Sequence, residues 1–279
     1  MKRRMQNIFI VLFFLLGLSL VLYPSVSDYW NSFHQSKAIQ SYAENVVSMD
    51  ESVYEKILQD AVEYNEHLAK YGQSWILTDE QLTDYNNQLN VVGNGLMSYV
   101  EIPKINCTLP IYHGTGDAVL QIAIGHIEGS SLPVGGESTH CVLSGHRGLP
   151  SAKLFSELDQ LAEGDTFMIR TLNEIYTYEV DQIRIVLPNE LNNVVIEEGK
   201  DYCTLVTCTP YGINTHRILV RGFRVDNTID SFDIKVVADA TQIDPVTVAP
   251  AIAIPMLLVL LIWLLIRYRR QKYLSQWKK

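Results

Sequence analysis

A cysteine at the end of a run of β-branched residues is the first candidate for chemistry in this 279-residue chain. The stretch Thr204–Arg217 reads TLVTCTPYGINTHR, so Cys208 ends an expected strand just before a Thr-Pro turn, and Arg217 follows nine residues later. A residue at a strand end can face a groove while the strand holds its backbone rigid. Cysteine attacks as the thiolate, so a catalytic Cys208 needs a base and an anion stabiliser nearby.

Two residues fit these two requirements. His146 lies in VLSGHRGLPSAKLF, directly after a buried-looking strand and between two glycines that let the backbone approach a ligand closely. Arg217 is always charged and donates hydrogen bonds in a fork, which suits an oxygen that gains negative charge. Zinc binding by Cys208, His146 and His216 is the rival interpretation, but the chain has neither Cys-x-x-Cys nor His-x-x-x-His spacing.

The other three cysteines lie inside expected strands among apolar neighbours. Cys107, Cys141 and Cys203 are interpreted as small buried hydrophobic residues or as members of a disulfide that the sequence does not assign. Cys203 and Cys208 are five residues apart on one strand, so their side chains point to opposite faces and do not pair.

The chain changes character near residue 93. Apolar residues at three-to-four spacing predict helices over 28–90, with Gly72 ending one helix and Thr78 or Asp79 capping another. From Met97 to Val225 the runs are short, β-branched and separated by turn residues, with a hairpin expected at TLNEI. This pattern predicts an all-β unit, a closed barrel or a sandwich.

Both ends of the chain are apolar and carry basic flanks. Ile8–Tyr23 is an uncharged run of 16 residues after Lys2, Arg3 and Arg4, and Val246–Ile266 is an uncharged run of 21 residues before a basic tail. We interpret the first as an uncleaved signal anchor, with a cleaved signal peptide as the alternative. The positive-inside rule then places both termini in the cytoplasm and the middle of the chain outside the cell.

The middle of the chain is acidic. All 31 acidic residues lie between Asp28 and Asp244 against 13 basic residues there, a formal charge of −18. Such a domain is repelled by nucleic acid phosphates, so no nucleic acid partner is expected. It could attract a cationic group such as a lysine amine.

Several motifs together resemble the sortases of Gram-positive cell surfaces. The resemblance covers the whole β unit and rests on TLVTC with its later arginine at 204–217, LSGHRGLPSAKLF at 143–155, YVEIPKINCTLPIYHGT at 99–115, GHIEGSSLPVGGESTH at 125–140 and FSELDQL at 155–161. The GHRGLPSAKLF run and the second apolar end resemble the class C, pilin-polymerising branch. The resemblance implies an eight-stranded, up-and-down sortase β-barrel with N-terminal helices and a transmembrane helix at each end.

The resemblance also implies a reaction. Cys208 would be the nucleophile, His146 the general acid/base, and Arg217 the residue that stabilises the oxyanion or the substrate. The enzyme would cleave a Leu-Pro-x-Thr-Gly-like (LPXTG) sorting signal between Thr and Gly, hold the Thr as a thioester, and pass it to a lysine of a pilin subunit. No cofactor and no metal are implied. The implied partners are pilin or surface proteins with such signals, and the membrane.

One departure from the family concerns a lid. Class C sortases carry a segment with an Asp-Pro-aromatic motif over the catalytic cysteine, whereas this chain reads KYGQSWILTDE at the corresponding place, with no Asp-Pro pair. Trp75 would be the aromatic plug with Ser74 in place of the anchoring group, or Trp75 would merely pack on the barrel. Without the usual anchor, occlusion of the cysteine is expected to be weaker.

The expected organisation runs through six parts. They are a signal anchor at 1–27, a helical arm at 28–92 with a lid at about 71–80, the catalytic barrel at 93–228, a linker at 229–245, a transmembrane helix at 246–266 and a basic cytoplasmic tail at 267–279. Three alternatives stay open: a hydrolase on the same fold, a housekeeping-type sortase that anchors surface proteins to cell-wall precursor, and a non-enzymatic membrane-tethered scaffold with Cys208 in a disulfide.

Overall fold

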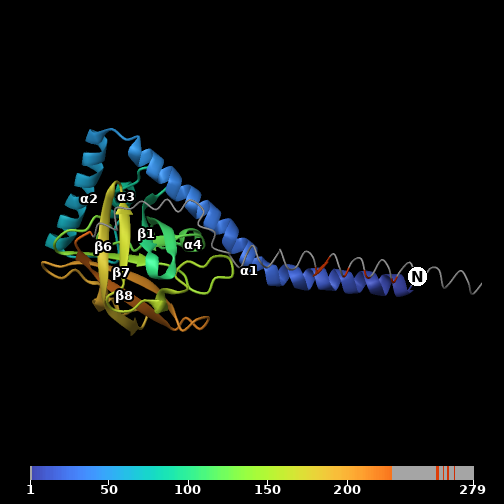
Figure 1. The fold of residues 1–279 in the computed structure, drawn as a ribbon. Helices are drawn as coiled ribbons and strands as arrows, with labels where there is room; N and C mark the ends of the chain where they lie inside the picture. The colour runs from blue at the N-terminus through green and yellow to red at the C-terminus, as the bar shows by residue number, and fades with distance from the viewer. Residues whose placement is uncertain (1, 228–255, 258–259, 261–262, 264–266, 268–279) are drawn as a thin grey trace, which may run out of the picture. The chain divides into compact units, whose positions relative to one another are not determined.

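The computed structural model describes residues 2–227, 256–257, 260, 263 and 267 (Figure 1). It divides the chain into two units, one formed by Met1–Tyr29 with Lys235–Lys279 and the other by Trp30–Ile234. The expected linker at 229–245 and nearly all of the expected second transmembrane helix lie outside the described residues. The second unit contains all three sequence-predicted site residues.

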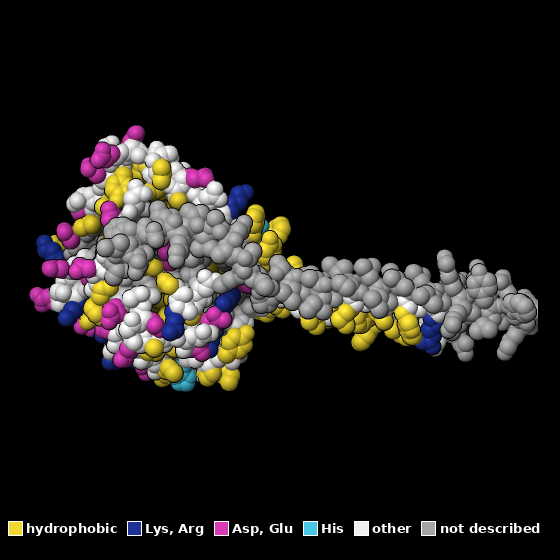
Figure 2. Space-filling model, viewed as in Figure 1, with side chains coloured by type: hydrophobic (Ala, Val, Ile, Leu, Met, Phe, Trp, Pro, Cys, Tyr) yellow, Lys and Arg dark blue, Asp and Glu magenta, His cyan; other side chains and the backbone are white. Residues whose placement is uncertain are grey.

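The first helix is long and apolar over its N-terminal part. Helix α1 (Lys2–Val47) contains a candidate membrane span, Met5–Val47, with a mean hydropathy of 2.4 over its most apolar window and none of that window buried. Phe9 and Phe13 are among the exposed hydrophobic side chains of this helix. Figure 2 shows hydrophobic side chains along it. By length and composition the helix can cross a membrane, in agreement with the expected anchor.

Two further helices begin and end where the sequence predicts. Helix α2 (Glu51–Tyr71) stops at Gly72, whose φ of 90° favours glycine. Helix α3 (Asp79–Asn87) starts with a capping box, in which the Gln81 amide donates to the Thr78 hydroxyl at 3.3 Å and the Thr78 amide donates to the Gln81 side chain at 2.9 Å. The segment 72–78 that joins the two helices is therefore fixed at both ends.

Each of the three helices makes at least one buried side-chain hydrogen bond with the β unit. The Tyr42 hydroxyl of α1 donates to the Met97 carbonyl at 2.9 Å. The Asn65 side chain of α2 donates to the Leu132 carbonyl at 3.1 Å and accepts from the Leu132 amide at 2.7 Å. The Tyr85 hydroxyl of α3 lies 2.9 Å from the Nδ1 atom of His126. These bonds fix where the helices lie against the barrel.

Eight strands form a closed barrel. In spatial order the sheet runs β1-β2-β3-β4-β7-β8-β6-β5, and β5 closes it onto β1. The strands are β1 (Leu96–Ile102), β2 (Cys107–His113), β3 (Ile124–His126), β4 (Thr139–Ser144), β5 (Thr166–Thr171), β6 (Glu174–Val186), β7 (Asp201–Thr209) and β8 (His216–Val225). Short helices occupy four connections: η1 (Pro103–Ile105), α4 (Asp117–Leu120), η2 (Leu158–Gln160) and η3 (Leu191–Val194).

The strand arrangement corrects the expected up-and-down topology. β2 pairs with β3 in parallel, and β4 pairs with β7 in parallel, whereas an up-and-down barrel has only antiparallel neighbours. A parallel pair needs a crossover, and here the β5–β6 hairpin lies between β4 and β7 in sequence while joining the barrel on its other side. The hairpin itself turns at Leu172 and Asn173, as TLNEI predicts.

The barrel interior is filled by large apolar side chains. Phe155, Phe167 and Tyr178 are fully buried, and Cys141 and Cys203 are buried in the same cluster. Alternation along each strand then sends the neighbouring residues, including Cys208, to the outer face.

We expect Asn65→Ala to lower the free energy of unfolding by about 2–3 kcal/mol, because the amide and carbonyl of Leu132 both lose their partner in a buried place. Chemical denaturation of the full chain in detergent measures this change. The exposed Asn86→Ala on α3 is the control and should change stability by less than about 0.5 kcal/mol. Equal effects of the two variants would show that α2 is not held by this bond.

Candidate active site

Cys208 and Arg217 are direct neighbours across two paired strands. Cys208 is the penultimate residue of β7, and the register pairs it with Arg217 near the start of β8. Directly opposed residues of an antiparallel pair project from the same face of the sheet, with Cβ atoms about 5 Å apart. The pairing therefore brings the expected nucleophile and the expected anion stabiliser together.

His146 follows β4, the strand that pairs with β7 on the side opposite to β8. The parallel register pairs Ser144 with Val206, and the Gly145 amide continues it by donating to the Val206 carbonyl at 3.0 Å. The Thr207 hydroxyl returns a bond of 2.7 Å to the Gly145 carbonyl. Extended by two residues beyond the Ser144–Val206 pair, the same register predicts that His146 lies beside Cys208.

Cys208 and Arg217 thus lie on the adjacent strands β7 and β8, and His146 follows two residues after the end of β4. His146, Cys208 and Arg217 are each half-buried. In this structure the Arg217 guanidinium donates to the backbone carbonyls of Asn214 and His216, at 3.2 and 3.0 Å. Because the guanidinium has five N–H donors, these bonds leave others for a substrate oxygen.

An apolar surface lies next to Cys208 on the same outer face. Its buried members are Val142, Val186, Val194, Val206 and Leu219. Val206 stands two residues before Cys208 on β7, and Val186 is the β6 partner of Arg217. We call these five residues the groove floor; they form one apolar cluster, and one of them, Val206, lies on the strand that carries Cys208.

The segment between α2 and α3 covers this floor. Trp75 packs against the groove floor together with Ile127. The Gln73 side chain accepts a 2.7 Å hydrogen bond from the Ile196 amide, in the connection between β6 and β7. At Gly129 an added Cβ would lie 2.0 Å from the Ser74 carbonyl oxygen, so the segment touches the backbone there as well.

The side chain of Ser74 bonds within this segment. Its hydroxyl donates to the Ile76 carbonyl at 2.7 Å and stays within the turn. The contacts with the barrel come from the side chains of Gln73 and Trp75 and from the backbone carbonyl of Ser74, which lies against Gly129. The sequence singled out Trp75 and Ser74 but not Gln73 and Gly129, because a glutamine and a glycine in loops carry no distinctive pattern.

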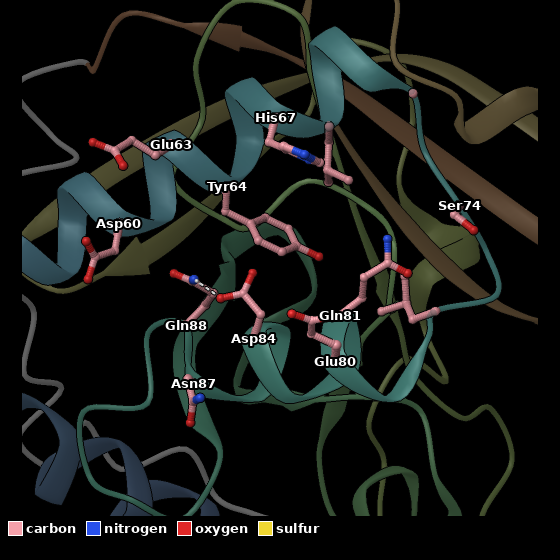
Figure 3. Close-up of a pocket in the computed structure, with 13 residues that line it drawn as sticks. Asp60, Glu63, Tyr64, His67, Ser74, Glu80, Gln81, Asp84, Asn87 and Gln88 are labelled. Atoms are coloured by element: carbon pink, nitrogen blue, oxygen red, sulfur yellow. Dashed lines mark hydrogen bonds between the residues drawn. The ribbon is translucent and has the colours of Figure 1, made fainter.

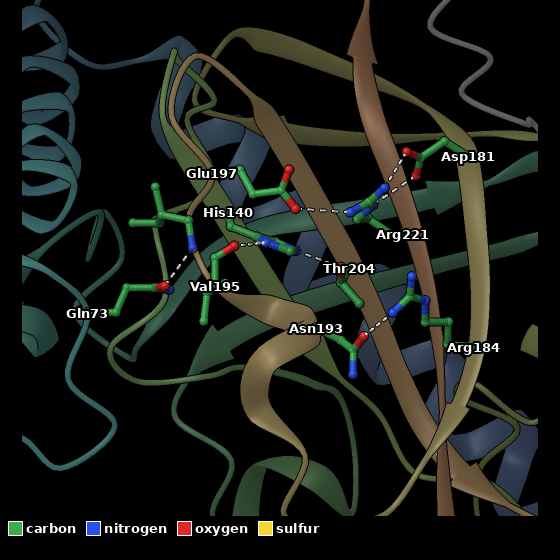
Figure 4. A network of polar contacts seen from close by, with 10 residues as sticks. Gln73, His140, Asp181, Arg184, Asn193, Val195, Glu197, Thr204 and Arg221 are labelled. Carbon is green, nitrogen blue, oxygen red and sulfur yellow. Dashed lines mark hydrogen bonds and ion pairs between the residues drawn. The ribbon is translucent and has the colours of Figure 1, made fainter.

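A polar network links β4, β7 and β8 to the connection between β6 and β7 (Figure 4). The neutral His140 ring lies 2.8 Å from the Val195 carbonyl through Nδ1 and 2.7 Å from the Thr204 hydroxyl through Nε2. The Nδ1–H therefore donates, and Nε2 accepts. Burial, opposed by the Val195 bond and aided by the charge of Arg221, lowers the pKa of His140 to about 4.

The four cysteines are all free thiols. Cys141 and Cys203 are buried register partners on β4 and β7. Burial raises the pKa of the Cys107 thiol to about 12, so it stays protonated at neutral pH. Cys107 and Cys208 are both half-buried, and Cys208 is the strand-register partner of Arg217. The disulfide that a scaffold role would require at Cys208 is not formed in this structure.

A separate polar pocket of about 820 Å³ lies between α2, α3 and the segment joining them (Figure 3). Tyr64 of α2 and Asp84 of α3 approach one another across it. Burial, with the charges of Asp84 and Glu128, raises the pKa of Tyr64 to about 12. Its lining contains none of the three expected catalytic residues. Within the described part of the chain, no group of three or more His, Cys, Asp and Glu could hold a metal ion.

Comparison with known proteins agrees with this geometry. The Sortase domain family matches residues 100–225. The crystal structure of sortase C1 from Streptococcus agalactiae is 57% identical, with a TM-score of 0.68, and the match covers 69% of this chain and 100% of that one. Sortase C from Streptococcus pneumoniae is 45% identical, with a TM-score of 0.63 and coverages of 69% and 98%. Sortase D of Bacillus subtilis is 33% identical over 129 residues, which is 45% of this chain and 62% of that protein.

We expect Trp75→Ala and Gly129→Ala each to raise the rate at which a maleimide reagent labels Cys208. A loss of about 1.4 kcal/mol in the closed arrangement would raise the labelling rate tenfold. Gly164→Ala is the matched control, because Gly164 has a similar positive φ of 91° but no atom within 4 Å of an added Cβ. Unchanged labelling in both test variants would mean that the segment does not restrict access to Cys208.

We expect His140 to make the protein less stable as pH falls. Its folded pKa of about 4 lies below the ordinary value near 6.5, so the unfolded chain binds the proton more readily between these pH values. The contribution is complete above about pH 6.5 and lost towards pH 4, by about 3 kcal/mol. Urea unfolding at pH 4.5 and 7.5 should show a smaller pH effect in His140→Gln. The exposed His67→Gln should behave like the wild type, and an unchanged pH effect in His140→Gln would contradict the assignment.

Proposed function

The chain belongs to the sortase family, and we propose that it is a class C cysteine transpeptidase that joins pilin subunits. The observation that supports this proposal is the register of β4, β7 and β8, which pairs Cys208 with Arg217 and ends on the β4 side two residues before His146. In this proposal Cys208 is the nucleophile, His146 the general acid/base and Arg217 the anion stabiliser.

The first half-reaction forms a thioester. The Cys208 thiolate attacks the threonine carbonyl carbon of a Leu-Pro-x-Thr-Gly-like signal, and the oxygen gains negative charge that the Arg217 fork can bind. The C–N bond to glycine then breaks, and protonated His146 gives its proton to the leaving amine. Threonine is left bound through its carbonyl to the sulfur.

The second half-reaction transfers the threonine. A lysine amine of a second pilin subunit loses a proton to His146 and attacks the thioester carbon. The C–S bond breaks, the thiolate returns, and an isopeptide bond joins the two subunits. The negative charge of the domain, with 31 acidic residues in the chain, suits a lysine acceptor.

The sorting signal would occupy the groove floor, because that apolar cluster includes Val206 on the strand of Cys208 and suits the leucine and proline of the signal. The segment at about 71–80 would then be a lid that the substrate must displace, with Trp75 as its plug. Gln73 and the backbone contact at Gly129 take the place of the Asp-Pro anchor that the sequence lacks.

Helix α1 would hold the enzyme in the membrane, and the predicted span Val246–Ile266 would hold it a second time. In this arrangement both termini lie in the cytoplasm and the barrel lies outside the cell. Membrane-held pilins would then meet the groove at a raised effective concentration. The crystal structure of Streptococcus pneumoniae sortase C is described as giving insight into pilin substrate specificity, which supports the same class of substrate here.

We expect the full chain in detergent, incubated with a Leu-Pro-x-Thr-Gly peptide, to gain the mass of the peptide's N-terminal part. The Cys208→Ala variant should gain nothing, because the sulfur that holds the thioester is absent. Intact-protein mass spectrometry measures the adduct. A pilin-derived lysine peptide and a cell-wall precursor amine are then added separately to see which discharges it.

Discharge by the lysine peptide supports pilin joining, and discharge by the wall amine alone would identify a housekeeping-type enzyme. Discharge by water at the same rate with and without either amine would identify a hydrolase. Absence of any adduct with a free Cys208, in both the wild type and Trp75→Ala, would contradict the enzyme with this signal.

A further inference from the structure

A second arginine joins the two segments that carry His146 and Cys208. Arg147 follows His146, and its guanidinium forms an ion pair with Asp159 in η2. Its Nη1 atom lies 3.4 Å from the hydroxyl of Thr209, the residue after Cys208. The guanidinium also lies over the ring of Tyr211, 5.8 Å from its centre, in the connection between β7 and β8.

The contact between these two segments is close. At Gly148 an added Cβ would lie 3.1 Å from the Tyr211 ring, and Gly148 has a φ of 79°. The Gly148 amide donates to the Ser156 hydroxyl at 3.1 Å, and this bond also holds the segment after His146 in place. The loop after His146 therefore packs directly on the loop after Cys208.

Arg147 is more buried than an arginine in a surface ion pair. Its side chain is 10% exposed, while its partner Asp159 is 44% exposed. The Nε–H is buried and has no hydrogen-bond partner among the described residues. Burying a guanidinium costs free energy, and exposed ion pairs return little of it. The cost of burying Arg147 is explained if its guanidinium holds the segments of the active site together.

We propose that Arg147 is a positioning residue for the reaction described above, holding the His146 segment against the strand end that carries Cys208. The inference rests on the proposed function. The ion pair with Asp159 fixes the guanidinium, which also contacts the hydroxyl of Thr209 and the ring of Tyr211. The parallel register of β4 and β7 ends just before this point, so the Arg147 bridge continues it through a side chain.

The test compares Arg147→Ala and Arg147→Lys with the wild type, as full chains in detergent. We expect Arg147→Ala to lower kcat for thioester formation by about 10- to 100-fold, since a misplacement of 1 Å can cost a factor of 100. KM should change by less than about threefold, because the groove floor is untouched. Arg147→Lys should recover part of the loss, because lysine keeps the charge but lacks the fork.

A second readout needs no substrate. Iodoacetamide labels Cys208 as the thiolate, and peptide mapping separates this site from the other three cysteines. We expect slower labelling of Cys208 in Arg147→Ala at pH 7, because the segment that carries His146 is no longer held against the strand end of Cys208. A wild type that forms no thioester overturns the proposed function, while the labelling rates still decide the role of Arg147.

Arg170→Ala is the matched control. Arg170 is also 10% exposed and paired with a carboxylate, Glu101, at 2.9 Å, but it lies on β5, away from the three site strands. Thermal unfolding confirms that each variant is folded. The proposal is overturned if Arg147→Ala keeps kcat and labelling within twofold of the wild type, or if Arg170→Ala loses as much as Arg147→Ala in both readouts.

Discussion

The in-register parallel pairing of β4 with β7 is the constraint on which the site depends. Its extension by two residues predicts that His146 lies beside Cys208, and the antiparallel pairing of β7 with β8 supplies Arg217 on the other side. A slip of one residue in either pairing would move a whole strand's side chains to the opposite face. The Thr207 hydroxyl and the Arg147 bridge extend the pairing past the last ladder bond, to where the chemistry would occur.

The same pairing leaves apolar side chains on the outer face of the barrel, where another segment must cover them. Alternation that sends Cys208 outward also sends Val142 and Val206 outward, so the barrel bears an apolar patch on its surface. Trp75 covers it from a segment whose ends are set by α2 and α3. Asn65 and Tyr85 dock those helices, so contacts remote from the cysteine decide where the cover lies. A substrate that uses this patch competes with the protein's own tryptophan for the same apolar surface.

The local features were accessible from sequence, and the long-range ones were not. The strand character around Cys208, the stop at Gly72 and the cap at Thr78 follow from residue types within a few positions. The family motifs singled out the residues that the strands bring together. The parallel partnership of β4 and β7 spans about 60 residues, and no short-range pattern encodes it. Gln73 and Gly129 matter only through what the fold places opposite them, so their roles needed the structure.

Direct crosslinking of position 146 to Cys208 tests the central claim. Adjacent strands place register partners about 5 Å apart, within the Cα separation that a disulfide spans. Mild oxidation of the His146→Cys variant should therefore link position 146 to Cys208, as read by peptide mapping. Ser144→Cys, two residues back on the same face, should give no link to Cys208. A link from position 144 but not from 146, or from neither, would show that the β4–β7 register does not bring His146 to the cysteine.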